Sequence, residues 1–312
     1  MLMLATSSFG LEALVASELR ELGLEVSRVE DARVFFEGDW QNLARANLWL
    51  RCADRVYLVI GSFEAKSFEQ LFEGVKALPW EDYLTRDASF PVKGKSAKST
   101  LKSVSDCQAI CKKAIVERLK NIYHCEWFDE TGPRMMVEVA LLKDEALLCL
   151  DASGSGLHRR GYRTLSGPAP LRETLAAALL HLARYAPQRM LWDPFCGSGT
   201  IAVEAAMMAR RIAPGLSRDF DMQRWPIVPA GTFEQGRQQA RESIDREAKL
   251  FIWASDVDES MVSMARYHAG KAGVERDIHI QRLDIRQVSS ARKNGILLCN
   301  PPYGERMLEK DH

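Results

Sequence analysis

Residues 190–201 read Met-Leu-Trp-Asp-Pro-Phe-Cys-Gly-Ser-Gly-Thr-Ile, a short apolar stretch that runs into a glycine turn and an alanine-rich segment. A strand, a glycine turn and a helix in this order open a doubly wound nucleotide-binding sheet. Gly197 and Gly199 let the backbone approach a ligand and adopt angles that a side chain forbids. The start of the helix favours an anionic group. The turn matches neither GxGxxG nor the phosphate-binding GxxxxGK[ST].

Later stretches repeat the pattern of an apolar strand that ends at a polar residue. The four predicted strands are 190–192, 250–254, 278–282 and 295–299. Asp193 follows the first; Asp256, with Asp258 as the alternate, follows the second, where an acid can bind ribose hydroxyls. Asp284 follows the third and could accept a hydrogen bond from an adenine amino group. An acid of this kind, taken alone, is more often a helix cap or a turn residue. Acids at the ends of three successive strands favour a nucleotide-binding site.

The fourth predicted strand runs directly into Asn300-Pro301-Pro302-Tyr303. Prolines donate no backbone hydrogen bond and fix the course of the chain, which leaves the Asn300 side-chain oxygen and the Pro301 carbonyl as acceptors for an amino group on a base. Tyr303 offers a ring on which a flipped or single-stranded base can stack, worth roughly 1–3 kcal/mol. The alternative is a proline-stiffened turn with a chance tyrosine.

Length and composition limit the class of protein. A chain of 312 residues suggests two or three domains, and 46% hydrophobic with 27% charged residues is typical of a soluble globular protein. Because 42 basic residues balance 42 acidic ones, any surface for nucleic acid must be a local patch. No run approaches the roughly 20 apolar residues of a membrane helix and no signal peptide is evident, so we expect a cytoplasmic protein.

The cysteines indicate neither disulfides nor a metal site. Seven cysteines without CxxC spacing fit reduced thiols. Cys107, Cys111, His124 and Cys125 match no standard zinc pattern, and we expect no metal.

Residues 1–156 contain two α+β patterns that end at a Ser-Gly-Ser-Gly boundary. Residues 1–58 have the order strand, helix, strand, strand, helix, strand, which suggests a small α+β layer. Residues 59–156 begin with a helix and a strand at 88–92, and continue with a basic segment, a long helix and a closing hairpin.

Basic residues gather in two places. Four lysines share a serine-rich stretch: Lys93, Lys95, Lys98 and Lys102. This pattern suits contact with phosphates, although a solvated lysine-rich surface would look the same. Three arginines share the predicted linker, residues 157–170: Arg159, Arg160 and Arg163. They could brace an RNA strand or act as a latch between domains.

The motifs together resemble those of class I S-adenosylmethionine-dependent amino-methyltransferases. The resemblance is carried by Asp193-Pro-Phe-Cys-Gly-Ser-Gly-Thr200, Asp256, Asp284 and Asn300-Pro-Pro-Tyr303. The upstream half looks like a ferredoxin-like layer followed by a THUMP domain. The whole chain thus resembles the bacterial THUMP-containing 23S rRNA guanine-N2 methyltransferases. The two longer motifs are specific for the reaction and less specific for the nucleotide.

The resemblance implies a role for each matching residue. The cofactor, S-adenosylmethionine, with S-adenosylhomocysteine as product, would be held by seven residues: Asp193, Phe195, Gly197, Gly199, Thr200, Asp256 and Asp284. The target amine would be held by Asn300 and Pro301, beside Pro302, while Tyr303 stacks on the base. No metal or covalent nucleophile is required, and Cys196 and Cys299 are interpreted as packing residues.

The chain departs from the family in one respect. A complete sheet of this class has seven strands, whereas residues 171–312 supply four, so we expect the natural protein to be longer. The leading hypothesis is methylation of guanine N2 in 23S rRNA. The alternatives are a tRNA guanine-N2 methyltransferase, an adenine-N6 DNA enzyme, which the THUMP-like half disfavours, and an RNA-binding protein that lacks catalysis. The target nucleotide and the oligomeric state stay open.

Overall fold

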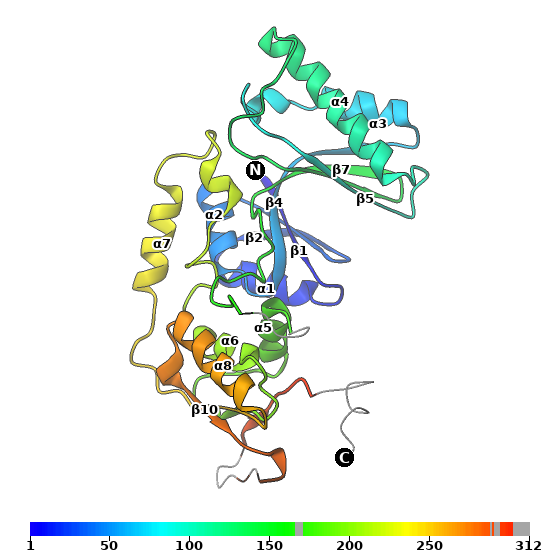
Figure 1. Ribbon diagram of the computed structural model, residues 1–312. Coiled ribbons are helices and arrows are strands. Elements are labelled where there is room, and N and C mark those ends of the chain that lie inside the picture. Colours follow the sequence, from blue (N-terminus) through cyan, green and yellow to red (C-terminus); the bar gives the residue numbers. More distant parts are fainter. Residues whose placement is uncertain (166–170, 288, 290–293, 302–312) are drawn as a thin grey trace. The chain divides into compact units, whose positions relative to one another are not determined.

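The fold was analysed in a computed structural model, which describes residues 1–165, 171–287, 289 and 294–301 (Figure 1). The chain forms two compact units. The N-terminal unit comprises Met1–Asn47, Ala53–Gly156 and Asp219–Gly236; the C-terminal unit comprises Leu48–Cys52, Leu157–Arg218 and Arg237–His312. No helix among the described residues is long and apolar enough to span a membrane.

One seven-stranded sheet runs through the N-terminal unit, in the order β2-β3-β1-β4-β7-β6-β5. Its strands are β1 (Leu2–Ser7), β2 (Glu25–Glu30), β3 (Arg33–Glu37), β4 (Ala53–Glu64), β5 (Val92–Ala97), β6 (Val137–Leu142) and β7 (Glu145–Asp151). The helices in the same part of the chain are α1 (Glu12–Glu21), α2 (Trp40–Trp49), α3 (Phe68–Ala77) and α4 (Val104–Tyr123). All neighbouring strands are antiparallel except β5 and β6.

Strand β4 joins the two α+β patterns into this single sheet. Its first half pairs with β1, where Met3 opposes Leu58, and its second half pairs with β7 as far as Glu64 opposite Glu145. The predicted boundary between residues 58 and 59 therefore falls inside a strand.

The strand predicted at residues 88–92 is wrong: β5 lies at 92–97 and covers the first part of the stretch that the sequence analysis described only as a basic segment. It is an edge strand, in which Lys93 and Lys95 are exposed and Gly94 is half-buried beneath α4. Lysines on an edge strand discourage pairing with another chain, and their low strand propensity hides the strand in the sequence.

The C-terminal unit is built on a parallel sheet with the order β10-β9-β8-β11. Its strands are β8 (Leu191–Asp193), β9 (Ile252–Asp256), β10 (Ile278–Arg282) and β11 (Ile296–Leu297). The α-helices in the described residues after 171 are α5 (Glu173–Leu182), α6 (Thr200–Ala209), α7 (Thr232–Glu242) and α8 (Glu259–Lys271). All four strands were predicted, and this strand order brings the carboxyl ends of β8 and β9 together at one edge.

The core of this unit lies between the parallel sheet and the helices α6 and α8, which pack on it (Figure 1). Small residues dominate α6, so the helix lies close to β8 and β9; Ala202, Ala205 and Ala206 are all buried. This packing fixes the start of α6, and with it the glycine turn, beside the carboxyl ends of the strands.

Candidate functional site

The glycine turn between β8 and α6 is held by backbone hydrogen bonds on its inner side. The Cys196 amide donates to the Ser255 carbonyl (2.9 Å) and the Gly199 amide to the Cys196 carbonyl (2.8 Å). Gly197 and Gly199 both have positive φ, +49° and +84°, as predicted for backbone that favours glycine. A Cβ on Gly197 would meet nothing within 4 Å, whereas one on Gly199 would lie 2.9 Å from Ala265 Cβ on α8. The two glycines therefore have different roles. Gly197 faces open space, whereas the missing side chain of Gly199 allows α8 to pack closely against the turn.

This difference gives a testable pair of substitutions. Gly199→Ala should lower the free energy of unfolding by about 1–3 kcal/mol, because the new methyl group is strained and overpacked against α8. Gly197→Ala carries only the backbone strain, about 1 kcal/mol, but it fills the space in front of the turn. Thermal unfolding and titration with S-adenosylhomocysteine should separate them: Gly199→Ala mainly lowers the melting temperature, and Gly197→Ala mainly weakens binding. If the two variants lowered the melting temperature and the affinity equally, the different roles assigned to Gly197 and Gly199 would be wrong.

Two carboxylates lie at the ends of neighbouring strands. Asp256 Oδ2 accepts from the Gly197 amide (2.9 Å) and Oδ1 from the Asp258 amide (3.0 Å). A carboxylate has about four acceptor positions, so the half-buried Asp256 keeps acceptor capacity for a ligand. Asp193 is only 1% exposed and accepts from the Phe195 amide (3.2 Å). Burial, reinforced by the negative charge of Asp256, raises the pKa of Asp193 to about 7.

Asp284 follows β10, as predicted, but has a partner that the sequence analysis did not foresee. Arg286, two residues later, donates to it from its backbone amide (2.9 Å) and from Nε (3.0 Å). These hydrogen bonds from Arg286 lower the pKa of Asp284 to about 2. Any ligand that uses this carboxylate has to share it with the exposed arginine.

The segment after β11 reaches the same edge of the sheet. The Leu298 amide donates to the Trp192 carbonyl (3.0 Å), which holds this segment beside β8. Burial and then the negative charge of Asp193 raise the pKa of the Cys299 thiol. Asn300 and Pro301 follow and are exposed. Pro302 and Tyr303 lie outside the described residues.

The remaining predicted cofactor residues belong to the turn itself. Phe195 is half-buried, and Thr200 is buried as the first residue of α6. Burial raises the pKa of the Cys196 thiol, and an un-ionised thiol is a poor nucleophile, consistent with its interpretation as a packing residue.

The structure contradicts the prediction that Arg160 contacts RNA. The side chain is buried, with Nη1 donating to the Leu157 carbonyl (2.7 Å), Nη2 to the Arg51 carbonyl (2.6 Å) and Nε facing Glu204 Oε1 at 3.4 Å. A buried arginine of this kind needs its partners to offset desolvation, so it holds the linker segment onto α6.

The other two linker arginines differ in exposure. Arg163 pairs with Glu173 (2.9 Å) and is 14% exposed, whereas Arg159 is exposed. Burial, followed by the positive charges of Arg172 and Arg159, lowers the pKa of His158 to about 4. Arg172, which the sequence analysis missed, is thus a second exposed cation in this region.

The serine-rich stretch forms an open cavity in the N-terminal unit. Its volume is about 690 Å³ and its lining is polar: Ser96, Lys98, Ser99, Thr100, Lys102 and Asp144. The Asp144 carboxylate accepts hydrogen bonds from the Thr100 amide (2.6 Å) and the Thr100 hydroxyl (3.3 Å). Lys93 lies outside this cavity on β5, and Lys95, also on β5, pairs with Glu138 (2.8 Å). Lys98 and Lys102 are therefore the lysines of the stretch that line a cavity.

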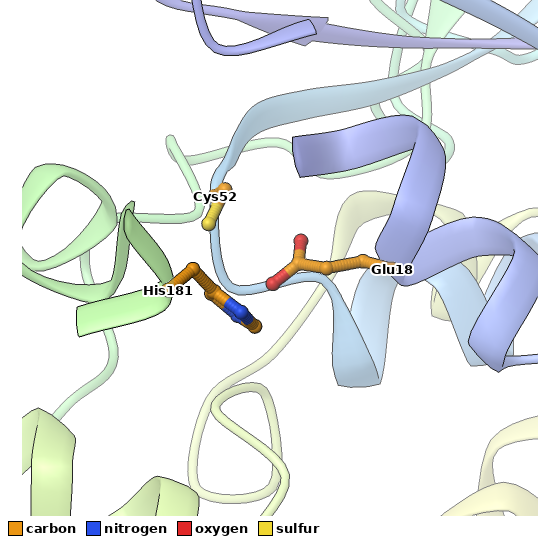
Figure 2. Close-up of side chains that lie close together, drawn as sticks. All are labelled: Glu18, Cys52 and His181. Carbon is orange, nitrogen blue, oxygen red and sulfur yellow. The ribbon is translucent and has the colours of Figure 1, made fainter. Parts of the chain in front are cut away.

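Within the described part of the chain, Cys107, Cys111, His124 and Cys125 do not form a group of possible metal ligands. Cys107 and Cys111 are buried on α4. Figure 2 labels Glu18, which belongs to the N-terminal unit, and Cys52 and His181, which belong to the C-terminal unit.

Family profiles match the chain in three consecutive segments. Residues 3–57 match a profile described as an RlmL ferredoxin-like domain, residues 65–151 a THUMP domain, and residues 160–312 an RMKL-like methyltransferase domain.

Relatives match over nearly the whole chain. A Bacillus subtilis protein named "Putative RNA methyltransferase YpsC" is 47% identical over 99% of this chain and 80% of its own length. The "Ribosomal RNA large subunit methyltransferase K/L" of Magnetococcus marinus is 36% identical over 98% of this chain, which spans only 44% of that longer protein.

Solved structures also match over nearly the whole chain. A Listeria monocytogenes protein described as a "predicted N6-adenine-specific DNA methylase" has a TM-score of 0.95 and 46% identity, over 99% of this chain and 81% of its own. SMU.472, described as "a putative methyltransferase complexed with SAH", has a TM-score of 0.93 and 42% identity, over 99% and 82%. The chain belongs to the family of S-adenosylmethionine-dependent RNA methyltransferases that combine a ferredoxin-like domain, a THUMP domain and an RMKL-like methyltransferase domain.

Proposed function

We propose that this protein transfers a methyl group from S-adenosylmethionine to N2 of a guanine in 23S ribosomal RNA, in the cytoplasm. The observation that carries the chemistry is the convergence of the glycine turn, Asp256 and the Asn300-Pro301 segment at one edge of the parallel sheet. The relatives named for the large ribosomal subunit support ribosomal RNA as the substrate.

The residues at this edge fit S-adenosylmethionine. Gly197 leaves open space in front of the turn, Asp256 keeps acceptor positions for ribose hydroxyls, and the carboxyl group of Asp193 would be held ionised by the cofactor's positive charge. When bound, the cofactor supplies a methyl group that its sulfonium makes reactive. The protein's task is then mainly to align the amine, for which the Asn300 side-chain oxygen and the Pro301 carbonyl are the proposed acceptors.

Asp193 gives this proposal a pH dependence. Below pH 7 the Asp193 carboxyl group is mostly protonated when no cofactor is bound. The ammonium group in the amino acid portion of S-adenosylhomocysteine would favour the ionised carboxylate, so binding of this ligand should release a proton. Affinity should then rise about tenfold from pH 6 to pH 8 and level off above it. Calorimetry at pH 6.5 in buffers of different ionisation enthalpy measures the proton release. Asp193→Asn should abolish both effects; an affinity independent of pH in the unaltered protein would place the cofactor's charge elsewhere.

The cavity on the N-terminal unit is the proposed contact for RNA phosphates. Lys98→Glu with Lys102→Glu should weaken RNA binding at least tenfold in low salt and reduce the slope of log K against log salt concentration by about 2. The matched control, Lys76→Glu with Lys120→Glu, makes the same charge change in the last turns of α3 and α4. Equal losses in both double variants would indicate a general charge effect instead.

The substrate is tested by methyl transfer from tritiated S-adenosylmethionine to total RNA from cells that lack the gene, using the full-length protein. Label in 23S rRNA that digests to N2-methylguanosine is expected. Label in tRNA would favour the tRNA alternative, and cofactor binding without transfer would favour an RNA-binding protein that lacks catalysis. Because one relative is described as an adenine-specific DNA methylase, a parallel reaction with DNA is the necessary control; the THUMP domain argues for RNA.

A further inference from the structure

We propose that His268, on α8, is a positioning residue for the cofactor turn. The inference rests on the cofactor site proposed above. His268 is fully buried, and its Nδ1 lies 3.0 Å from the carbonyl oxygen of Ser198, the central residue of the turn Gly197-Ser198-Gly199. A carbonyl can only accept a hydrogen bond, so Nδ1 carries the proton in this contact.

The ring has the charge state and the surroundings that this role requires. Burial lowers the pKa of His268, and hydrogen bonding to the backbone of Ser198 and of Leu165 opposes this shift; a lowered pKa favours the neutral ring, which donates from Nδ1 to the Ser198 carbonyl. Aromatic rings flank it: the Tyr162 ring, 6.5 Å away at an angle of 61°, and the Tyr267 ring, 5.8 Å away at 60°. Tyr162 is itself fixed, because its hydroxyl donates to Glu204 Oε1 (3.1 Å).

The hydrogen bond between His268 and Ser198 adds a third restraint to the turn Gly197-Ser198-Gly199, which has open space on the side of Gly197. Asp256 holds the Gly197 amide, and Ala265, three residues before His268 on α8, abuts Gly199. The peptide unit between these two points is the one whose carbonyl His268 binds. Without that hydrogen bond, the Ser198–Gly199 peptide unit would keep the bond from its Gly199 amide to the Cys196 carbonyl but lose the restraint on its carbonyl oxygen. His268 therefore stabilises the turn in the form whose Gly197 face stays open.

Three substitutions separate this role from simple packing. His268→Asn keeps a side-chain N–H near the position of Nδ1, whereas His268→Leu keeps the volume without a donor and His268→Ala removes both. We expect the dissociation constant for S-adenosylhomocysteine to rise about tenfold in the leucine and alanine variants. In the asparagine variant it should stay within about threefold of the unaltered protein. Rescue by leucine but not by asparagine would show that the ring only fills space, and would overturn the inference.

A second measurement needs no variant. In the 15N spectrum of the full protein at pH 7.5, His268 should show a protonated Nδ1 and an unprotonated Nε2. The opposite tautomer would overturn the inference even if no variant folds. Failure of the unaltered protein to bind S-adenosylhomocysteine would instead refute the proposed cofactor site, and the role of His268 with it.

Discussion

Replacing Asn300 by alanine should lower the rate constant of methyl transfer about 100- to 1,000-fold and leave the affinity for S-adenosylhomocysteine within about twofold of the unaltered protein. Asn300 is exposed at the carboxyl edge of the sheet, next to the segment that β8 holds. Its side-chain oxygen is proposed to orient the amine, and to interact with the positive charge that the nitrogen gains as the new bond forms. Both effects belong to the transition state, so they should appear in the rate of transfer and not in cofactor binding.

Two further variants make this result specific. Asn300→Asp keeps an acceptor oxygen and should retain more activity than the alanine variant. Asn121→Ala changes an exposed asparagine on α4 and should leave the rate unchanged. A large loss of cofactor affinity in Asn300→Ala would contradict the assigned role, because it would mean that the side chain helps to build the cofactor site.

Asp256→Ala should have the largest effect on cofactor binding. The carboxylate is proposed to accept from ribose hydroxyls, and it also holds the Gly197 and Asp258 amides. Loss of hydrogen bonds to a charged acceptor costs about 2–3 kcal/mol, which corresponds to roughly a 30- to 160-fold rise in the dissociation constant for S-adenosylhomocysteine. Isothermal titration of the folded variant measures this change directly.

Asp258, two residues later, provides the matched control. It is the N-cap of α8, where its Oδ1 accepts from the Ser260 amide (2.8 Å). Asp258→Ala should therefore lower the free energy of unfolding by about 1 kcal/mol without a comparable loss of affinity. If Asp258→Ala weakens binding as strongly as Asp256→Ala, the ribose would be assigned to the alternate acid.

The elements that the sequence predicted best are those whose pattern is local. Strands β8, β9 and β10 each combine an apolar run with a polar residue at its end, and all three lie within two residues of the predicted positions. The end of the first helix is equally local, because Gly23 just after it has a φ of +73° and its amide donates to the Arg20 carbonyl. In these cases the residues that determine the structure lie within one turn or one strand of each other.

Two of the features that the sequence did not predict, at Arg160 and His268, depend on distant partners. Arg160 is indistinguishable from Arg159 in a basic linker until Glu204, 44 residues later, folds against it. The contact of His268 with Ser198 spans 70 residues; its only trace in the sequence is a histidine on the apolar face of a helix, near Val262 and Ala265. Composition gives the charge of a segment, but only the fold decides which charges stay in water.

The pairing of β4 with both β1 and β7 has a consequence for cooperativity. Because one strand contributes backbone hydrogen bonds to both α+β patterns, neither pattern can lose its sheet without exposing an edge of the other. The ferredoxin-like and THUMP segments should therefore melt in a single transition and exchange their slowest amide protons at similar rates. What reads in sequence as two modules is, in thermodynamic terms, one foldon.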